Sequence, residues 1–173
     1  SAQTTMQIAR QSGSQVKSML ARRFAQGDNI MENKALENFK NGYNCAQSVL
    51  IHCSEMIGMD QKNAVKIATG FGAGMGRMQE VCGAITGGII AINYKYGREE
   101  NEEKQAQERA YNKVKSLMIL FENQNGSCIC KKLLNNIDLK TNEGQNVMKD
   151  NNMIEICYKC VSTAAEITEK LLE

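Results

Sequence analysis

The chain of 173 residues has no proline and no tryptophan, and only 5% of its residues are aromatic. The alternation of apolar and polar residues that is typical of half-buried strands is hard to find. There is no run of about 20 apolar residues, so no segment is expected to span a membrane. The 21 basic and 19 acidic side chains give a net charge of +2, too balanced for a nucleic-acid-binding surface. These absences predict a globular protein that binds neither membranes nor nucleic acids.

A secretion signal is also missing, because no charged start is followed by an apolar core. The chain begins with Ser1 and not with an initiator Met, so a signal peptide removed by cleavage stays open as an alternative. The seven cysteines are about 4% of the residues, fewer than in small secreted disulfide scaffolds, and an odd number leaves one thiol unpaired. Free thiols suit a reducing compartment, so we expect a cytoplasmic protein with redox or metal chemistry.

Apolar residues recur at three- and four-residue steps along most of the chain, which is typical of helices. The segment after Cys82 is apolar nearly all round, as expected for a helix at the centre of the fold. The predicted fold class is therefore all-α, a single-domain multi-helix bundle with a buried central helix after a glycine-rich turn. We expect helices over residues 6–24, 43–57, 83–97, 99–121, 128–134 and 154–171. Two more helices are expected, one that runs from its N-cap Asp28 to Gly42 and one that runs from Asp60 to about residue 69. Gly58 ends the helix at 43–57, and residues 135–152 are expected to form a polar linker.

The stretch GFGAGMGRMQEVCGAITGG, residues 70–88, contains seven glycines and Cys82. A dinucleotide-binding loop needs a strand before G-x-G-x-x-G, and a Walker loop needs Gly-Lys-Ser/Thr. Here the spacing is G-x-G-x-G after a helix-like segment, and Gly76 is followed by Arg77. A tight turn is the favoured interpretation, because it places Cys82 near the first turn of the buried helix. Unpaired N–H groups and the helix dipole stabilise a thiolate at such a position.

Four separated cysteine blocks resemble one known family. The blocks are GYNCAQSVL (42–50), the glycine stretch (70–88), CKKLL (130–134) and CYKCVSTAAEITEKLL (157–172). Together they resemble the redox-active family named for its C_GCAxxG_C_C pattern, over about residues 34–172. The resemblance implies a small, mostly helical, redox-active or metal-binding domain at 34–173, which a helical extension at 1–33 precedes. It places the family's cysteines at Cys45, Cys82, Cys130 and Cys157.

We predict that these four cysteines meet in the folded chain, and two uses of such a cluster stay open. In the first, all four are catalytic and cycle between dithiol and disulfide, with Cys82 as the attacking thiolate of a thiol oxidoreductase. In the second, the same four hold an iron–sulfur cluster or another metal without turnover. The sequence does not name the redox partner. Gly83 and Gly87 leave a flat helix face that gives room for a homo-oligomer.

Cys157 and Cys160 form a C-x-x-C pair, but its surroundings exclude the commonest uses of that motif. A thioredoxin-like site would need a βαβ unit, which is not expected here. A c-type haem would need histidine at the position of Val161, and a zinc ribbon would need a second C-x-x-C.

Three further residues are assigned lesser roles. Cys53 lies on an apolar helix stripe and is expected to be a buried, inert thiol. Cys128 is either a spare thiol or a local ligand. His52, the only histidine, is expected on a solvated helix surface.

Overall fold

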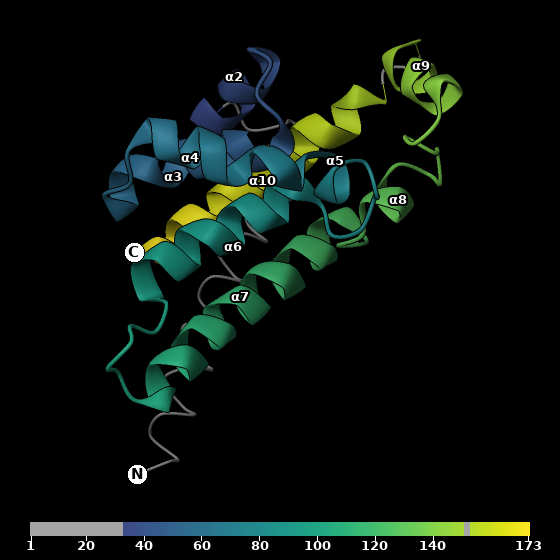
Figure 1. Ribbon diagram of the computed structural model, residues 1–173. Helices are drawn as coiled ribbons and strands as arrows, with labels where there is room; N and C mark the ends of the chain where they lie inside the picture. The colour runs from purple at the N-terminus through teal and green to yellow at the C-terminus, as the bar shows by residue number, and fades with distance from the viewer. Residues whose placement is uncertain (1–32, 151–152) are drawn as a thin grey trace. The chain divides into compact units, whose positions relative to one another are not determined.

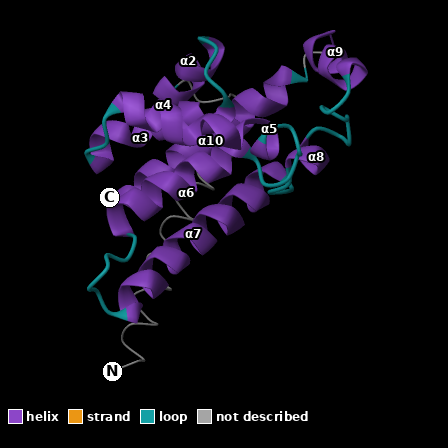
Figure 2. Ribbon diagram, in the orientation of Figure 1, coloured by secondary structure: helices purple, strands orange, loops and turns teal. Residues whose placement is uncertain are grey.

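The computed structural model describes residues 33–150 and 153–173, all of which belong to one unit, residues 31–173. Helices dominate this part of the chain (Figure 2), and its only β pairing is one antiparallel bridge between Val81 and Ile129. The predicted all-α, single-domain class is confirmed. The elements labelled in Figure 1 are α2 (Lys34–Lys40), α3 (Cys45–Ile57), α4 (Gln61–Ala68), α5 (Gly72–Met75), α6 (Gly83–Tyr96), α7 (Lys104–Asn125), α8 (Cys130–Leu133), α9 (Asn142–Asp150) and α10 (Ile154–Leu172), with a 3₁₀ turn, η1 (Thr69–Phe71).

Helix α6 is the buried central helix that the sequence predicts. It packs against α3, α7 and α10, and its contact with α3 is the most extensive between any two helices described (Figure 1). Ile85, Ala91 and Ile92 are fully buried in these contacts. A helix that is apolar nearly all round can be stable only in such a position, because each of its faces needs an apolar partner.

Two glycines of α6 let α3 come unusually close. A Cβ added at Gly87 would lie 2.5 Å from the carbonyl oxygen of Ala46, and one added at Gly83 would lie 3.1 Å from the Cβ of Cys45. The Gly83 position also lies close to η1, since the added Cβ would be 2.9 Å from the carbonyl oxygen of Phe71. The flat face predicted from these glycines therefore exists, and α3 of the same chain covers it. This face is not available for contact with a second copy of the chain.

Local capping signals set several helix ends where the sequence places them. Gly58 ends α3 in the left-handed conformation, with a φ of 69°. Asp60 caps α4, since its side chain accepts hydrogen bonds from the N–H groups of Lys62 and Asn63. Both predictions are confirmed.

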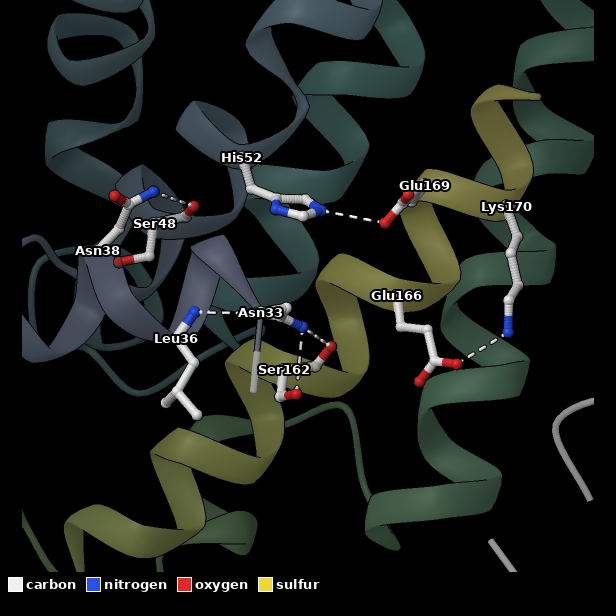
Figure 3. Close-up of polar contacts among 9 residues, drawn as sticks. All are labelled: Asn33, Leu36, Asn38, Ser48, His52, Ser162, Glu166, Glu169 and Lys170. Atoms are coloured by element: carbon white, nitrogen blue, oxygen red, sulfur yellow. Dashed lines mark hydrogen bonds and ion pairs between the residues drawn. The ribbon is translucent and has the colours of Figure 1, made fainter. Parts of the chain in front are cut away.

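Two predicted helix starts lie too early. The helix that ends near Gly42 is α2, and it begins at Lys34 with Asn33 as N-cap, so its predicted start was wrong. Asn33 accepts from the N–H of Leu36 at 3.0 Å and donates to Ser162 of α10 at 3.2 Å (Figure 3). The contact with α10 fixes this start, and periodicity along the chain does not reveal it. Similarly, the helix predicted over 99–121 is α7, which begins at Lys104 and ends at Asn125.

Three predictions concern residues outside the described part of the chain. They are the N-cap at Asp28, the helix at 6–24, and residues 1–32 of the N-terminal extension.

The polar linker predicted at 135–152 is wrong over much of its length, because residues 142–150 form α9. The hydroxyl of Thr141 accepts a hydrogen bond from the N–H of Gly144 at 3.0 Å, and Gln145 donates to the carbonyl of Leu139 at 3.0 Å. Met148 packs on a small core formed by Leu134, Leu139 and Cys130. Few side chains of α9 are apolar and pack on the rest of the fold. Its composition therefore resembles that of a linker, which is why the sequence did not predict this helix.

Across residues 33–150 and 153–173, none of the helices combines the length and apolar character needed to cross a bilayer.

Candidate functional site

Five of the seven cysteines line one cavity of about 290 Å³. The four that the sequence predicts to meet are all among them, and the fifth is Cys160, which the sequence does not assign to the cluster. They lie at the starts of α3, α6 and α8 and on α10: Cys45, Cys82, Cys130, Cys157 and Cys160. Every cysteine of the chain is a free thiol in this structure.

A capping box holds Cys45 at the first position of α3. The side chain of Asn44 accepts from the N–H of Gln47 at 2.9 Å, and the side chain of Gln47 accepts from the N–H of Asn44 at 3.0 Å. Asn44 also donates to the carbonyl of Thr69 at 3.0 Å. Gly72 lies directly on this amide, since an added Cβ would be 2.7 Å from the Asn44 side chain. The sequence NCAQ therefore fixes both the helix start and the place of its thiol.

The glycine run forms a left-handed turn and not a phosphate loop. Five consecutive residues, 73–77, have positive φ values of 53°, 67°, 66°, 61° and 69°. Gly74 and Gly76 adopt such angles freely, whereas Ala73, Met75 and Arg77 each cost roughly 1–2 kcal/mol there. The segment before the run is helix α4 and not a strand, so the setting of a dinucleotide-binding loop is absent.

The turn leads into a short pairing that brings Cys82 beside Cys130. The N–H of Cys82 donates to the carbonyl of Cys128 at 2.8 Å, and the N–H of Cys130 donates to the carbonyl of Glu80 at 2.7 Å. Gly74 makes room for Cys130, because a Cβ at this glycine would be 2.8 Å from the Cβ of that cysteine. Backbone hydrogen bonds therefore hold together two thiols that are far apart in the sequence.

Gln79 is a positioning residue that sequence reasoning missed. Only 2% of it is exposed, and its φ is 62°. Its side chain donates to the carbonyl of Ile137 at 2.7 Å and accepts from the N–H of Leu139 at 2.9 Å. The amide thus ties the left-handed turn to the wall of the cavity. No motif in the sequence marks it, because its partners are backbone groups about 60 residues away.

Cys82 occupies the N-cap position of α6, and its surroundings favour the thiolate. A hydrogen bond from Cys160 lowers the pKa of Cys82, and the N–H groups of Ala84 and Ile85 lower it further, against the opposing effect of burial. The same hydrogen bond raises the pKa of Cys160 far above the usual range, with burial and the charge of Cys82 acting in the same direction. The pKa values of these two cysteines therefore shift in opposite directions, and Cys82 is the one that loses its proton more readily.

A second pair of thiols faces the same cavity. A hydrogen bond with Cys157 raises the pKa of Cys45 well above its ordinary value, and burial adds to the shift. Burial, followed by the charges of Cys82 and Cys157, raises the pKa of Cys130 to about 12. Cys45, Cys130 and Cys160 therefore hold their protons more tightly than an ordinary thiol does, whereas Cys82 holds its proton less tightly.

The remaining candidate residues lie away from the cavity. Cys53 is fully buried, and burial raises its pKa to about 12, so the predicted burial of this thiol is confirmed. The thiol of Cys128 donates to the carbonyl of Met118 at 3.4 Å and does not line the cavity. The solvated position predicted for His52 is wrong. Its side chain is only 13% exposed, and its Nε2 lies 3.2 Å from a carboxylate oxygen of Glu169 on α10 (Figure 3).

The thiols of the cavity are the soft donors that iron–sulfur clusters and zinc take. Within residues 33–150 and 153–173, however, no three His, Cys, Asp or Glu side chains have an arrangement that could hold a metal ion. The predicted metal centre at Cys45, Cys82, Cys130 and Cys157 finds no support in the placement of these side chains.

A known family matches residues 43–171, about three quarters of the chain, and its description is "Putative redox-active protein (C_GCAxxG_C_C)". The chain belongs to this family. The matched range contains all five cysteines of the cavity and agrees with the resemblance expected over 34–172. In this member the residues from Cys82 read CGAITG, so the glycine follows the cysteine and does not precede it as in the family's pattern. Neither a curated protein nor a solved structure matches the chain.

Proposed function

We propose that the protein is a thiol oxidoreductase, which passes electrons through reversible dithiol–disulfide exchange at the cysteine cavity. Cys82 is the attacking thiolate, and Cys45, Cys130 and Cys157 complete the reactive cluster. The observation that carries this proposal is the position of Cys82, which lies at the N-cap of α6 and lines one cavity together with four other cysteines. The thiolate is the nucleophile in disulfide exchange, so a sulfur whose ionised form is stabilised reacts first.

The surroundings of Cys82 suit exchange chemistry. Attack on a disulfide leaves a mixed disulfide, which a second thiol must resolve, and the cavity supplies several thiols. The raised pKa values of Cys45, Cys130 and Cys160 keep these neighbours protonated until the first step has occurred. Regeneration of the dithiol needs a reducing compartment, which is why we propose a cytoplasmic protein.

The experiment compares the thiol content of anaerobically purified protein before and after mild oxidation, and again after reduction. We expect oxidation to remove two thiols per chain and reduction to restore them. Cys82→Ser is expected to prevent the loss, whereas Cys128→Ser, which removes a buried thiol outside the cavity, should still lose two. An unchanged thiol count in the wild type contradicts the proposal.

Metal analysis and visible absorption of the same sample test the rival use of the cluster. Iron or zinc in stoichiometric amount, lost in Cys82→Ser, would favour a metal or iron–sulfur carrier over the oxidoreductase.

A further inference from the structure

The cavity that the five cysteines line has an apolar wall, formed by Leu134, Leu139 and Met148. Leu134 and Leu139 are buried and belong to one apolar cluster with Cys130, and Met148 and Cys157 pack against this cluster. Two of the thiols therefore lie directly beside apolar carbon. A ligand whose carbon chain covers the apolar wall removes apolar surface from water, which favours its binding.

The opening of the same cavity is basic. Of the described residues that line it, only Arg77 and Lys149 are exposed, so these two side chains lie where the cavity meets solvent. No acidic side chain is among these lining residues. Within the described part of the chain, neither Arg77 nor Lys149 forms an ion pair. Two positive charges without a counter-charge favour an anionic group at the opening.

The volume of the cavity limits the length of the ligand. One water molecule occupies roughly 30 Å³ in the liquid, so a cavity of about 290 Å³ holds roughly ten non-hydrogen atoms. Cys82 is 5% exposed, so a disulfide must enter the cavity before this cysteine can attack it. A short disulfide fits these limits, whereas a disulfide fixed in a folded protein would remain outside.

We propose that the substrate of this cavity is a small disulfide with an apolar carbon chain and a carboxylate. The chain lies against the apolar wall beside the thiols, and the carboxylate lies at the opening, where Arg77 and Lys149 attract it. The inference rests on the proposed function and names the chemical class of its substrate.

For a cyclic disulfide of this class the reaction has two steps. In the first, the Cys82 thiolate attacks one ring sulfur, the ring S–S bond breaks, and the other ring sulfur becomes a thiolate. In the second, another thiol of the cavity gives its proton to that thiolate and attacks the sulfur of Cys82. The mixed disulfide breaks, the first ring sulfur leaves as a thiolate, and a protein disulfide forms. Two electrons pass from two protein sulfurs to the substrate, which leaves with one thiol and one thiolate.

The first experiment measures binding without a disulfide, so its result does not depend on the redox reaction. Reduced full-length protein is titrated by isothermal titration calorimetry with octanoate, with hexanoate and with the neutral analogue octanamide. Octanoate is expected to bind roughly fifteenfold more tightly than hexanoate, because each of two further buried methylenes contributes roughly fourfold. It is expected to bind roughly tenfold more tightly than octanamide, because two exposed positive charges attract its carboxylate.

Three variants test the charges at the opening. Arg77→Asn and Lys149→Gln should each lower the ratio of the octanoate and octanamide affinities roughly two- to fivefold. Asparagine suits position 77, whose φ is 69°, because it tolerates the left-handed conformation better than most residues do. Lys66→Gln is the matched control and should leave the ratio unchanged, since this exposed lysine of α4 does not line the cavity.

The second experiment uses lipoate and lipoamide, two cyclic disulfides that differ in charge, each in excess over the reduced protein. Samples are quenched with acid at successive times, and free thiols are alkylated and counted on the intact protein by mass spectrometry. At equal concentrations below saturation, lipoate should remove protein thiols roughly tenfold faster than lipoamide. Arg77→Asn should narrow this difference by the same factor as it lowers the ratio of affinities.

Two kinds of outcome overturn the inference and leave the proposed function intact. If a segment of the chain or a second copy already fills the cavity, octanoate will not bind. Equal rates for lipoate and lipoamide, or a ratio of affinities that neither Arg77→Asn nor Lys149→Gln lowers, also contradict the inference, although thiol exchange itself continues. If octanoate binds but neither lipoate nor neutral bis(2-hydroxyethyl) disulfide removes any protein thiol, the proposed function fails and the inference fails with it.

Discussion

Replacing Gly87 by alanine tests whether the close contact of α3 and α6 holds the two helices that carry Cys45 and Cys82. The new Cβ would lie 2.5 Å from the carbonyl oxygen of Ala46 and 3.1 Å from its Cα. Ordinary contact begins near 3.4 Å, so the backbones must separate by about 0.9 Å. Overpacking of this kind costs about 1–3 kcal/mol, and the upper half of that range applies because backbone lies on both sides. Alanine returns about 1 kcal/mol through its higher helix propensity, so the net loss is about 1–2 kcal/mol.

The assay is thermal unfolding followed by circular dichroism. For a chain of this length, each kcal/mol shifts the melting temperature by roughly 2–4 °C, so Gly87→Ala is expected to melt roughly 2–8 °C lower. Gly70→Ala is the control, because Gly70 has open space around its Cβ position and no positive φ. Its melting temperature should change by less than about 2 °C. An unchanged or higher melting temperature for Gly87→Ala would refute the claim that the two backbones are in contact there.

Three shorter predictions concern other parts of the chain. The raised pKa of Cys53, about 12 against 9.0 when unperturbed, contributes stability that is fully present below pH 9 and is lost between pH 9 and 12. In Cys53→Ala, the free energy of unfolding should therefore fall less steeply with pH in this window than in the wild type, by roughly 1.4 kcal/mol per pH unit. Chemical denaturation at several pH values measures the difference. Arg77 lines the cavity, whose lining has no acidic side chain, so Arg77→Asn should slow the reaction with anionic dithiodiglycolate, a disulfide small enough for the cavity, roughly two- to fivefold. The rate with neutral bis(2-hydroxyethyl) disulfide should stay the same, and an equal loss for both probes would contradict a charge effect. Met75 has a φ of 66° and is 39% exposed, so Met75→Gly should raise the free energy of unfolding by about 1 kcal/mol, measured by urea denaturation.

The parts of the fold that were predictable depend on short-range signals. Gly58 and Asp60 end and begin helices through their own side chains or backbone angles, and neither needs a distant partner. The apolar character of 83–96 predicts a central helix for the same reason, since every face of it must be buried. Four of the five cysteines at the cavity were named from the resemblance to the family, and not from helical periodicity.

The parts that were missed depend on contacts between distant segments. The C-x-x-C spacing places Cys157 and Cys160 one turn apart on a helix, but only the packing of α10 against α3 and α6 decides which thiol meets which partner. His52 likewise reads as a surface residue until Glu169 of α10 faces it. Helix α9 has a polar composition, so its tendency to fold depends on Met148 reaching the core beside α8.

The left-handed turn at 73–77 is the strongest departure from local preference, and its place in the chain explains why it persists. Ala73, Met75 and Arg77 together cost roughly 3–6 kcal/mol in these angles, a large share of the 5–15 kcal/mol that stabilises a typical domain. A right-handed continuation of η1 would avoid that cost, but the chain would then follow another course toward Val81 and its pairing with Ile129. Cys82 would lose the carbonyl of Cys128 as acceptor, and Gln79 would lose both backbone partners near Leu139. The strain is therefore maintained by the same hydrogen bonds that position Cys82, so the chain cannot relax the turn without moving this residue.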